Sequence, residues 1–253
     1  MDIKQNKKLN NDYVKRYYDT QVANIGGSYT DERWHSSVVK EFEYQQTARA
    51  IRSALSGRQY KKVIEIGPGD GVWTSLIKET VSGAIHLVEQ SGEMLSRAKE
   101  RFSSLRNITF EHSDFLTSHP PADNDLIVAI RCFEYFEDKE GALEKMRDLL
   151  TRDGRIVIIT KNADLVTSSS VQHKTLHSDQ VSRRDMQHLA IKAGLVIEKI
   201  YPAVIRWKAS YTIMRFLFDF LHKMTTWSQG IITIPFLETY ATESYVYIFR
   251  TQK

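Results

Sequence analysis

The chain is poor in cysteine and lacks the long apolar runs that cross membranes. Cys132 is the single cysteine among 253 residues, which excludes an intramolecular disulfide framework and a cysteine-based zinc site, and favours a reducing compartment. No run reaches the ~18 apolar residues of a membrane-spanning helix, and the polar stretch 1–11 lacks the apolar core of a signal peptide. We therefore expect a cytoplasmic protein, and no metal site.

A strong charge of one sign is also missing. The formal net charge is only +4, and lysine and arginine are scattered among the acidic residues. This pattern is typical of a solvated surface and argues against nucleic acid as a partner. With 42% hydrophobic and 26% charged residues, the composition indicates one globular α/β domain with additions.

From Lys61 onward, short β-branched runs alternate with helical stretches, which is typical of a parallel sheet covered on both faces. The predicted strands are Val63–Ile66, Ala84–Glu89, Ile108–Glu111, Asp125–Ile130, Arg155–Thr160, Leu195–Ile200 and Ser244–Arg250. Helices are predicted over Glu41–Leu55, 71–80, 91–103, 138–150 and Ser178–Ala193. Only 167–170 has the composition of a mobile loop.

We divide the single domain 1–253 into four parts. Residues 1–57 form a helical cap or lid, 58–200 the ligand-binding core, 201–240 a helical insertion and 241–253 the last strand. The insertion holds nine of the 27 aromatic residues. From Val204 to Leu221 its apolar residues recur at helical spacing, which predicts an amphipathic helix of roughly six turns.

Three roles remain open for the insertion 201–240. It packs as core or as a dimer interface, it forms a lid over an apolar acceptor, or it lies on a membrane surface. In the last case its basic side chains would face anionic lipid, namely Arg206, Lys208, Arg215 and Lys223.

The nine residues 63–71 are the most informative stretch, because a strand runs directly into three glycines and then into a helix. Such a cradle binds nucleotide-like ligands through close backbone approach and the helix N-terminus. A dinucleotide site needs a small residue at position 72, where this chain has Val72, and no lysine follows Gly71 as a phosphate-binding P-loop requires. S-adenosylmethionine is the remaining ligand.

Over residues 60–160 the chain resembles the class I S-adenosylmethionine-dependent methyltransferases. Residues 65–71 are similar to the family's first motif, residues 89–95 to its second, and 149–155 to its turn into the fifth strand. The resemblance implies a Rossmann-like doubly wound sheet of about seven strands, mostly parallel with an antiparallel last strand. It also implies the cofactor-binding residues Glu65, Gly67, Pro68, Gly69, Gly71, Glu89, Gln90, Met94, Ser113, Asp114, Phe115 and Arg131. Glu89 is expected to accept both ribose hydroxyls, and Asp114 to contact the adenine amino group.

Tyr135 stands where many small-molecule members of the family carry a histidine after strand four. We rank Tyr135 and His35 as the first candidates for a catalytic group. Glu134, His173, His177 and His222 remain as alternatives. The segment 29–35 lies where family members fold a lid, so we expect the substrate or lid contacts Tyr29, Arg33 and Trp34, together with Trp207 and Tyr211 from the insertion.

The acceptor is expected to be a small molecule, either apolar or lipidic, or a glycan or natural-product intermediate. Arg131-Cys132-Phe133-Glu134 lacks the two prolines that amino-type nucleic-acid methyltransferases carry after strand four. Cys132 is interpreted as a buried structural residue, not as a nucleophile. The alternatives are a methyltransferase-fold partner or regulatory subunit, and an RNA or protein methyltransferase.

Overall fold

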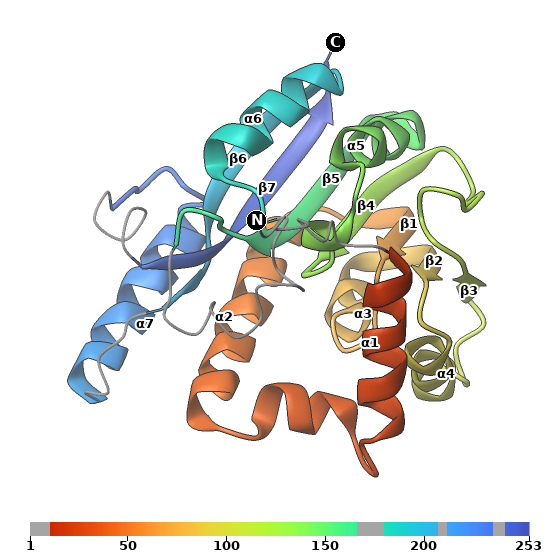
Figure 1. The fold of residues 1–253 in the computed structure, drawn as a ribbon. Coiled ribbons are helices and arrows are strands. Elements are labelled where there is room, and N and C mark those ends of the chain that lie inside the picture. Colours follow the sequence, from red (N-terminus) through yellow and green to blue (C-terminus); the bar gives the residue numbers. More distant parts are fainter. Residues whose placement is uncertain (1–10, 166–179, 207–211, 235–240, 253) are drawn as a thin grey trace, which may run out of the picture.

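One seven-stranded sheet forms the centre of the computed structural model, which describes residues 11–165, 180–206, 212–234 and 241–252. The strand order is β3-β2-β1-β4-β5-β7-β6 (Figure 1). The strands are β1 (Tyr60–Ile66), β2 (Val81–Glu89), β3 (Ile108–His112), β4 (Asn124–Ile130), β5 (Leu150–Lys161), β6 (Leu195–Ile205) and β7 (Thr242–Thr251). The pairs from β3 to β5 are parallel, and β7 is antiparallel to both of its neighbours. The order reverses between β1 and β4, and such a switch point is where open α/β sheets bind ligands.

Helices cover both faces of the sheet because successive strand side chains point in opposite directions. Val63 and Leu126 belong to one core cluster, whereas Ile64 and Ile127 belong to the other. The first cluster includes side chains of α2 (Val38–Leu55), α3 (Thr74–Ile77) and the residue that ends α4 (Gly92–Arg101). The second includes α5 (Lys139–Asp148) and α6 (Arg183–Lys192). The predicted doubly wound sheet with an antiparallel last strand is therefore confirmed.

Each predicted strand lies within an observed one, and the main differences concern boundaries. Residues 150–154, expected as a turn, already belong to β5, whose register against β4 shifts between Asn124 and Leu126. Gly154 permits this close approach, because a Cβ atom there would lie 2.7 Å from the carbonyl oxygen of Asn124. The predicted helix over 71–80 is shorter and consists of α3 followed by the 3₁₀ turn Lys78–Thr80.

The predicted insertion 201–240 starts too early. Residues 201–205 continue β6 and pair with β7, so Val204 lies on a strand and not on the amphipathic helix. The spacing of apolar residues alone did not separate those of 201–205 from those of the helix that follows. That helix, α7 (Thr212–Trp227), buries Phe218 and His222 and exposes Phe216, Phe220 and Trp227. None of the described helices combines the length and apolar composition needed to cross a membrane.

The N-terminal cap consists of α1 (Asn11–Ala23), the π-helix η1 (Asp31–His35) and α2. Arg97 of α4 fastens the end of α1, because its guanidinium donates to the carbonyls of Val22, Ile25 and Gly27 at 2.6–3.0 Å. The last carbonyls of a helix lack hydrogen-bond partners within that helix. A cation beside them donates hydrogen bonds and also interacts favourably with the negative end of the helix dipole. As a result, α1 lies beside α4 (Figure 1).

Gln46 joins the cap to the far edge of the sheet. Its buried side chain donates to the carbonyl of Ile205 at 3.2 Å and accepts from the Ile205 amide at 2.7 Å. One amide group therefore satisfies both backbone groups of an edge-strand residue that water cannot reach.

We expect Gln46→Leu to lower the free energy of unfolding by about 1–3 kcal/mol, because it leaves buried polar groups without partners. Chemical denaturation measures the change. The control is Gln45→Leu, at the exposed neighbouring position, which should change the free energy of unfolding by less than about 0.5 kcal/mol. Equal losses in the two variants would contradict this role.

Candidate functional site

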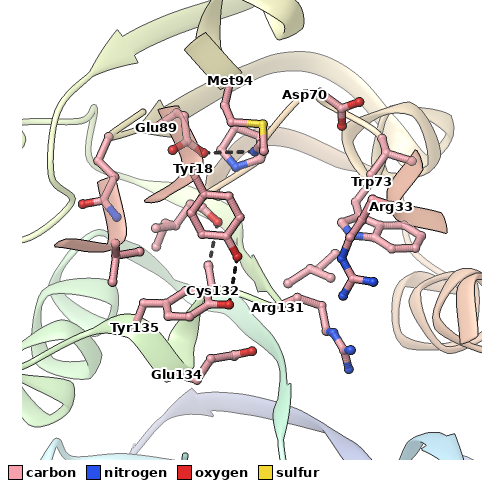
Figure 2. A pocket seen from close by; sticks show the side chains of 18 of the residues that line it. Tyr18, Arg33, Asp70, Trp73, Glu89, Met94, Arg131, Cys132, Glu134 and Tyr135 are labelled. Atoms are coloured by element: carbon pink, nitrogen blue, oxygen red, sulfur yellow. Dashed lines mark hydrogen bonds between the residues drawn. The ribbon is translucent and has the colours of Figure 1, made fainter. Parts of the chain in front are cut away.

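A cavity of about 720 Å³ lies at the carboxyl ends of β1, β2 and β4, beneath the cap. Its size is in the range of pockets that hold small molecules and cofactors. Residues of the glycine loop, of the ends of β2 and β4, and of α1 and η1 surround it (Figure 2). The site is therefore at the switch point of the sheet, and the N-terminal segment lines one side of it.

The glycine loop after β1 takes a backbone path that requires glycine. Gly67, Gly69 and Gly71 have φ values of 62°, 60° and 84°, a region that side chains strongly disfavour. A Cβ atom at Gly67 would lie 2.7 Å from the Cβ atom of Cys132, and one at Gly71 would overlap the ring of Phe102. At Gly69 the nearest atom would be the Met94 sulfur at 3.9 Å, so the loop is open toward the cavity at this point.

Glu89, at the end of β2, carries the carboxylate of the cavity floor. Its two oxygens accept from the amides of Gly69 at 3.0 Å and Ser91 at 2.9 Å. Burial raises the pKa of Glu89, although these backbone donors oppose the shift. The carboxylate thus positions the glycine loop and faces the cavity.

Asp70 connects the loop to the cap. Its buried carboxylate accepts from Thr30 of the cap and from the Arg101 guanidinium at 2.9 Å, and Arg101 also donates to the Thr30 hydroxyl at 2.8 Å. Trp34 of η1 packs edge-on against Trp73, with ring centroids 5.1 Å apart. Tyr44 stacks on Trp73, with ring centroids 5.2 Å apart. Trp34 therefore both lines the cavity and packs the cap onto α3.

The other end of the cavity is built around the loop after β4. The Tyr18 hydroxyl of α1 lies 2.8 Å from the Tyr135 hydroxyl (Figure 2). Burial raises the pKa of both phenols above the ordinary value, so both remain protonated at neutral pH. Tyr135 therefore presents a neutral hydroxyl at the wall of the cavity. The neighbouring Glu134 carboxylate is buried and accepts from Thr160 at 2.9 Å.

Arg131 directly follows β4 and has an unusual backbone. Its φ is 59°, which is rare outside glycine. Its guanidinium pairs with both Glu243 oxygens at 2.6 and 3.2 Å, and both side chains are less than a tenth exposed. The arginine holds the pKa of Glu243 at about 2, despite the opposing effect of burial. This ion pair links the end of β4 to β7 at the cavity wall.

Most predicted site residues surround this one cavity. The cofactor-binding candidates that line it are Gly67, Pro68, Gly69, Glu89, Gln90, Met94, Ser113, Asp114, Phe115 and Arg131, and the candidates Tyr29, Arg33, Trp34 and Tyr135 line it as well. Gly71 stands behind the loop against Phe102. Glu65 is buried beneath it and accepts from Thr74 at 2.6 Å. These two support the site without lining it.

The two histidine candidates that the structure describes, His35 and His222, do not line the cavity. His35 is exposed and contacts Glu41, so the structure does not place it as a catalytic group. His222 is buried between Arg49 and the Ala203 carbonyl, and burial together with Arg49 lowers its pKa to about 3. His173, His177, Trp207, Tyr211 and the loop 167–170 lie outside the described residues.

Sequence reasoning missed several lining residues. Lys161 and Glu243 stand at the end of β5 and the start of β7, and the rule that ligands meet strand ends gives a signal for them. Tyr18 of α1 belongs to no sequence motif that would have pointed to it. Among the described residues, no group of histidine, cysteine, aspartate or glutamate is arranged to hold a metal ion.

Comparisons with known proteins agree with this geometry. A family model described as a methyltransferase domain matches residues 64–156. Malonyl-[acyl-carrier protein] O-methyltransferase 1 of Ilyobacter polytropus is 27% identical over 106 residues, covering 42% of this chain and 39% of that protein. Ribosomal RNA small subunit methyltransferase A of Acidobacterium capsulatum is 24% identical over 196 residues, covering 74% of this chain and 68% of that protein. The chain thus spans about two fifths of the first two curated relatives.

The fold also matches solved methyltransferases. The N-methyltransferase NodS from Bradyrhizobium japonicum, in complex with S-adenosyl-l-homocysteine, superposes with a TM-score of 0.65 at 14% identity over 94% of this chain and 98% of that one. A methyltransferase bound to the Trm112 activator of Haloferax volcanii gives a TM-score of 0.63 at 15% identity, covering 93% and 98% of the two chains. At this identity the likeness shows a common fold.

Glu65, which is buried beneath the glycine loop, makes the stability of the protein depend on pH. Burial raises the pKa of Glu65 to about 8, so the folded state binds a proton more tightly than the unfolded state does. The contribution of Glu65 to stability is therefore fully present below pH 4.5 and is lost as pH rises through 8.

We expect the unfolding free energy of the parent protein, relative to Glu65→Gln, to fall with pH across this window, by at most about 1.4 kcal/mol per pH unit. Denaturation at a series of pH values measures both proteins. Parallel curves would show that Glu65 is charged in the folded state.

Proposed function

Because the chain belongs to the class I S-adenosylmethionine-dependent methyltransferase family, we propose that it transfers the methyl group of this cofactor to a small-molecule acceptor. The observation that carries the proposal is one cavity of about 720 Å³, partly open to solvent, that two sets of residues line. The glycine loop and Glu89 line one end, and Tyr135 with Lys161 lines the other. Cofactor and acceptor would thus share one compartment beneath the cap.

The residues at the first end suit the cofactor. The backbone at Gly69 is open to a ligand, and the Glu89 carboxylate can accept two hydroxyl hydrogen bonds. Met94 and Phe115 offer apolar surface to a purine, and Asp114 offers a carboxylate to its amino group. These residues would hold S-adenosylmethionine, whose positive sulfonium supplies an electrophilic methyl group.

The contribution of this chain is then mainly positioning. Methyl transfer needs the acceptor atom aligned with the methyl group, and holding both partners in place accounts for a large part of such rate enhancements. Tyr18 and Tyr135 present hydroxyls at the acceptor end, and residues of α1 and η1 line the cavity from above. No histidine is among the described lining residues, which favours an acceptor atom that is nucleophilic without a histidine base.

The size of the cavity, about 720 Å³, supports a small molecule over a macromolecule. The relative that modifies ribosomal RNA raises RNA as an alternative, but the loop after β4 reads Arg131-Cys132-Phe133-Glu134, without the prolines of amino-type nucleic-acid enzymes. A partner or regulatory subunit is a further alternative. It is disfavoured because a subunit without activity has no need of an intact glycine loop with Glu89 beneath it.

Cofactor binding is the first test. We expect the protein to bind S-adenosylmethionine and S-adenosylhomocysteine with micromolar dissociation constants by calorimetry. Glu89→Ala should weaken binding by roughly tenfold or more through the lost hydrogen bonds, and Gly69→Arg should abolish it by filling the loop. Glu100→Ala, at an exposed position of α4, is the matched control. A parent protein that fails to bind either compound would overturn the proposal.

The acceptor class is the second test. Purified protein and cofactor with a labelled methyl group are incubated with a cell extract, which is then separated into small molecules, RNA and protein. We expect the label in the small-molecule fraction, and its loss with Gly69→Arg. Enzyme-dependent label in RNA or protein alone would replace the small-molecule acceptor by a macromolecule.

A further inference from the structure

One turn of the chain after β3 forms part of the cavity wall. Asp114 and Phe115 line the cavity, and the Asp114 carbonyl accepts from the Ser118 amide at 2.9 Å, so the chain 114–118 closes a single turn. A single turn satisfies few of its own backbone carbonyls, because no further helical amides follow it. The donors for the remaining carbonyls must come from another element.

Lys145, in the last turn of α5, supplies these donors. Its ammonium donates to the carbonyls of Phe115, Leu116 and Ser118 at 2.5, 3.1 and 2.6 Å. These carbonyls match the three N–H donors of a lysine ammonium. The ammonium also lies 4.9 Å from the centroid of the Phe115 ring, within the range of a cation–π contact. All of these contacts converge on the same turn, although Lys145 does not line the cavity itself.

One peptide unit connects Lys145 to the carboxylate of Asp114. The Phe115 carbonyl and the Leu116 amide belong to the same planar group, and that amide donates to Asp114 Oδ1 at 2.9 Å. A cation therefore stands at the carbonyl end of the peptide dipole and a carboxylate at its amide end, and each interaction strengthens the other. A rotation of this peptide would break both hydrogen bonds at once, so the ammonium holds the carboxylate in one direction.

The charges that face Lys145 agree with an ammonium held in place. Burial lowers the pKa of Lys145, and the carboxylates of Glu111 and Asp114 oppose this shift. A lysine side chain loses much conformational freedom when it is fixed in this way. Here the backbone contacts and the two carboxylates offset that cost, and the segment that they fix is a wall of the cavity.

We propose that Lys145 is a positioning residue that makes the site selective for an adenine base. By holding the turn 114–118, it keeps the Asp114 carboxylate directed at the exocyclic amino group of adenine and the Phe115 ring against the base. This role rests on the proposed function, because it concerns the cofactor end of the same cavity. Loss of the ammonium weakens recognition of the amino group more than binding of the rest of the cofactor, which the glycine loop and Glu89 would hold.

Calorimetric titration of S-adenosylhomocysteine, and separately of S-inosylhomocysteine, tests this role. The inosyl compound carries a carbonyl oxygen in place of the amino group, so it lacks the donor and turns an acceptor toward the Asp114 carboxylate. We expect the parent protein to bind the adenosyl compound at least about tenfold more tightly, since a site built around a hydrogen bond rejects the analogue that lacks it.

Variants of Lys145 separate positioning from structural damage. Lys145→Met keeps the length of the side chain without its donors and should reduce the preference for the adenosyl compound at least about threefold. Lys145→Arg keeps a cation with several N–H donors and should retain most of the preference. Lys99→Met makes the same change at an exposed position of α4 and should alter neither affinity. If Lys145→Met does not fold, Lys145→Gln, which also removes the charge, carries the same expectation.

Asp114→Asn completes a double-mutant cycle. If Lys145 acts through Asp114, replacing the lysine by methionine should change the preference by less than about twofold in the Asp114→Asn background. A lysine that only stabilises the fold would instead lower both affinities by the same factor in either background.

The outcomes distinguish this role from the proposed function. If the parent protein binds S-adenosylhomocysteine without a preference over the inosyl compound, or if Lys145→Met lowers both affinities equally, the positioning role is wrong and cofactor binding stands. A preference that Lys145→Met reduces equally with and without Asp114→Asn also overturns it. A protein that binds neither compound overturns both the positioning role and the proposed function.

Discussion

Removal of charged side chains from water beneath the N-terminal cap is the constraint on which the rest of the structure depends. Such groups are costly unless each finds a hydrogen-bond or ion-pair partner. Glu89 meets this requirement with backbone amides of the glycine loop, Asp70 with Thr30 and Arg101, and Arg131 with Glu243. Each solution joins two elements that are distant in sequence, so the same contacts that satisfy the charges also fix the shape of the cavity.

The cap is an integral part of this arrangement. It lines the cavity with Tyr18 and Trp34. Arg97 at the end of α1 and Asp70 in the glycine loop are among the residues that tie it to the core of the fold. The cap residues, Lys161 and Glu243 all lie outside the matched segment 64–156, so that segment supplies only part of the pocket wall.

The glycine-loop side of the cavity was predictable from the sequence, and the side formed by β5 and β7 was not. Strand–glycine–helix order and the strand-end acid Glu89 follow local rules of turn geometry and sheet topology, and those rules placed the core strands as well. Val204 was wrongly expected on a helix, and His35 does not line the cavity, for a different reason. Nothing in the local sequence shows that His35 faces solvent beside Glu41, or that β7 pairs with residues 201–205. Lys161 and Glu243 likewise acquire their meaning only when β5 and β7 become neighbours.

The left-handed backbone at Arg131 has a consequence for protein engineering. Glycine at this position would relieve the backbone cost, of order 1–3 kcal/mol, but would leave the Glu243 carboxylate buried without its partner. Stability and the ion pair thus make opposing demands on one residue, as is common where function is located. Thermostabilised versions of this protein are therefore better sought on the outer face of α7, where Phe216, Phe220 and Trp227 meet water, than at the wall of its pocket.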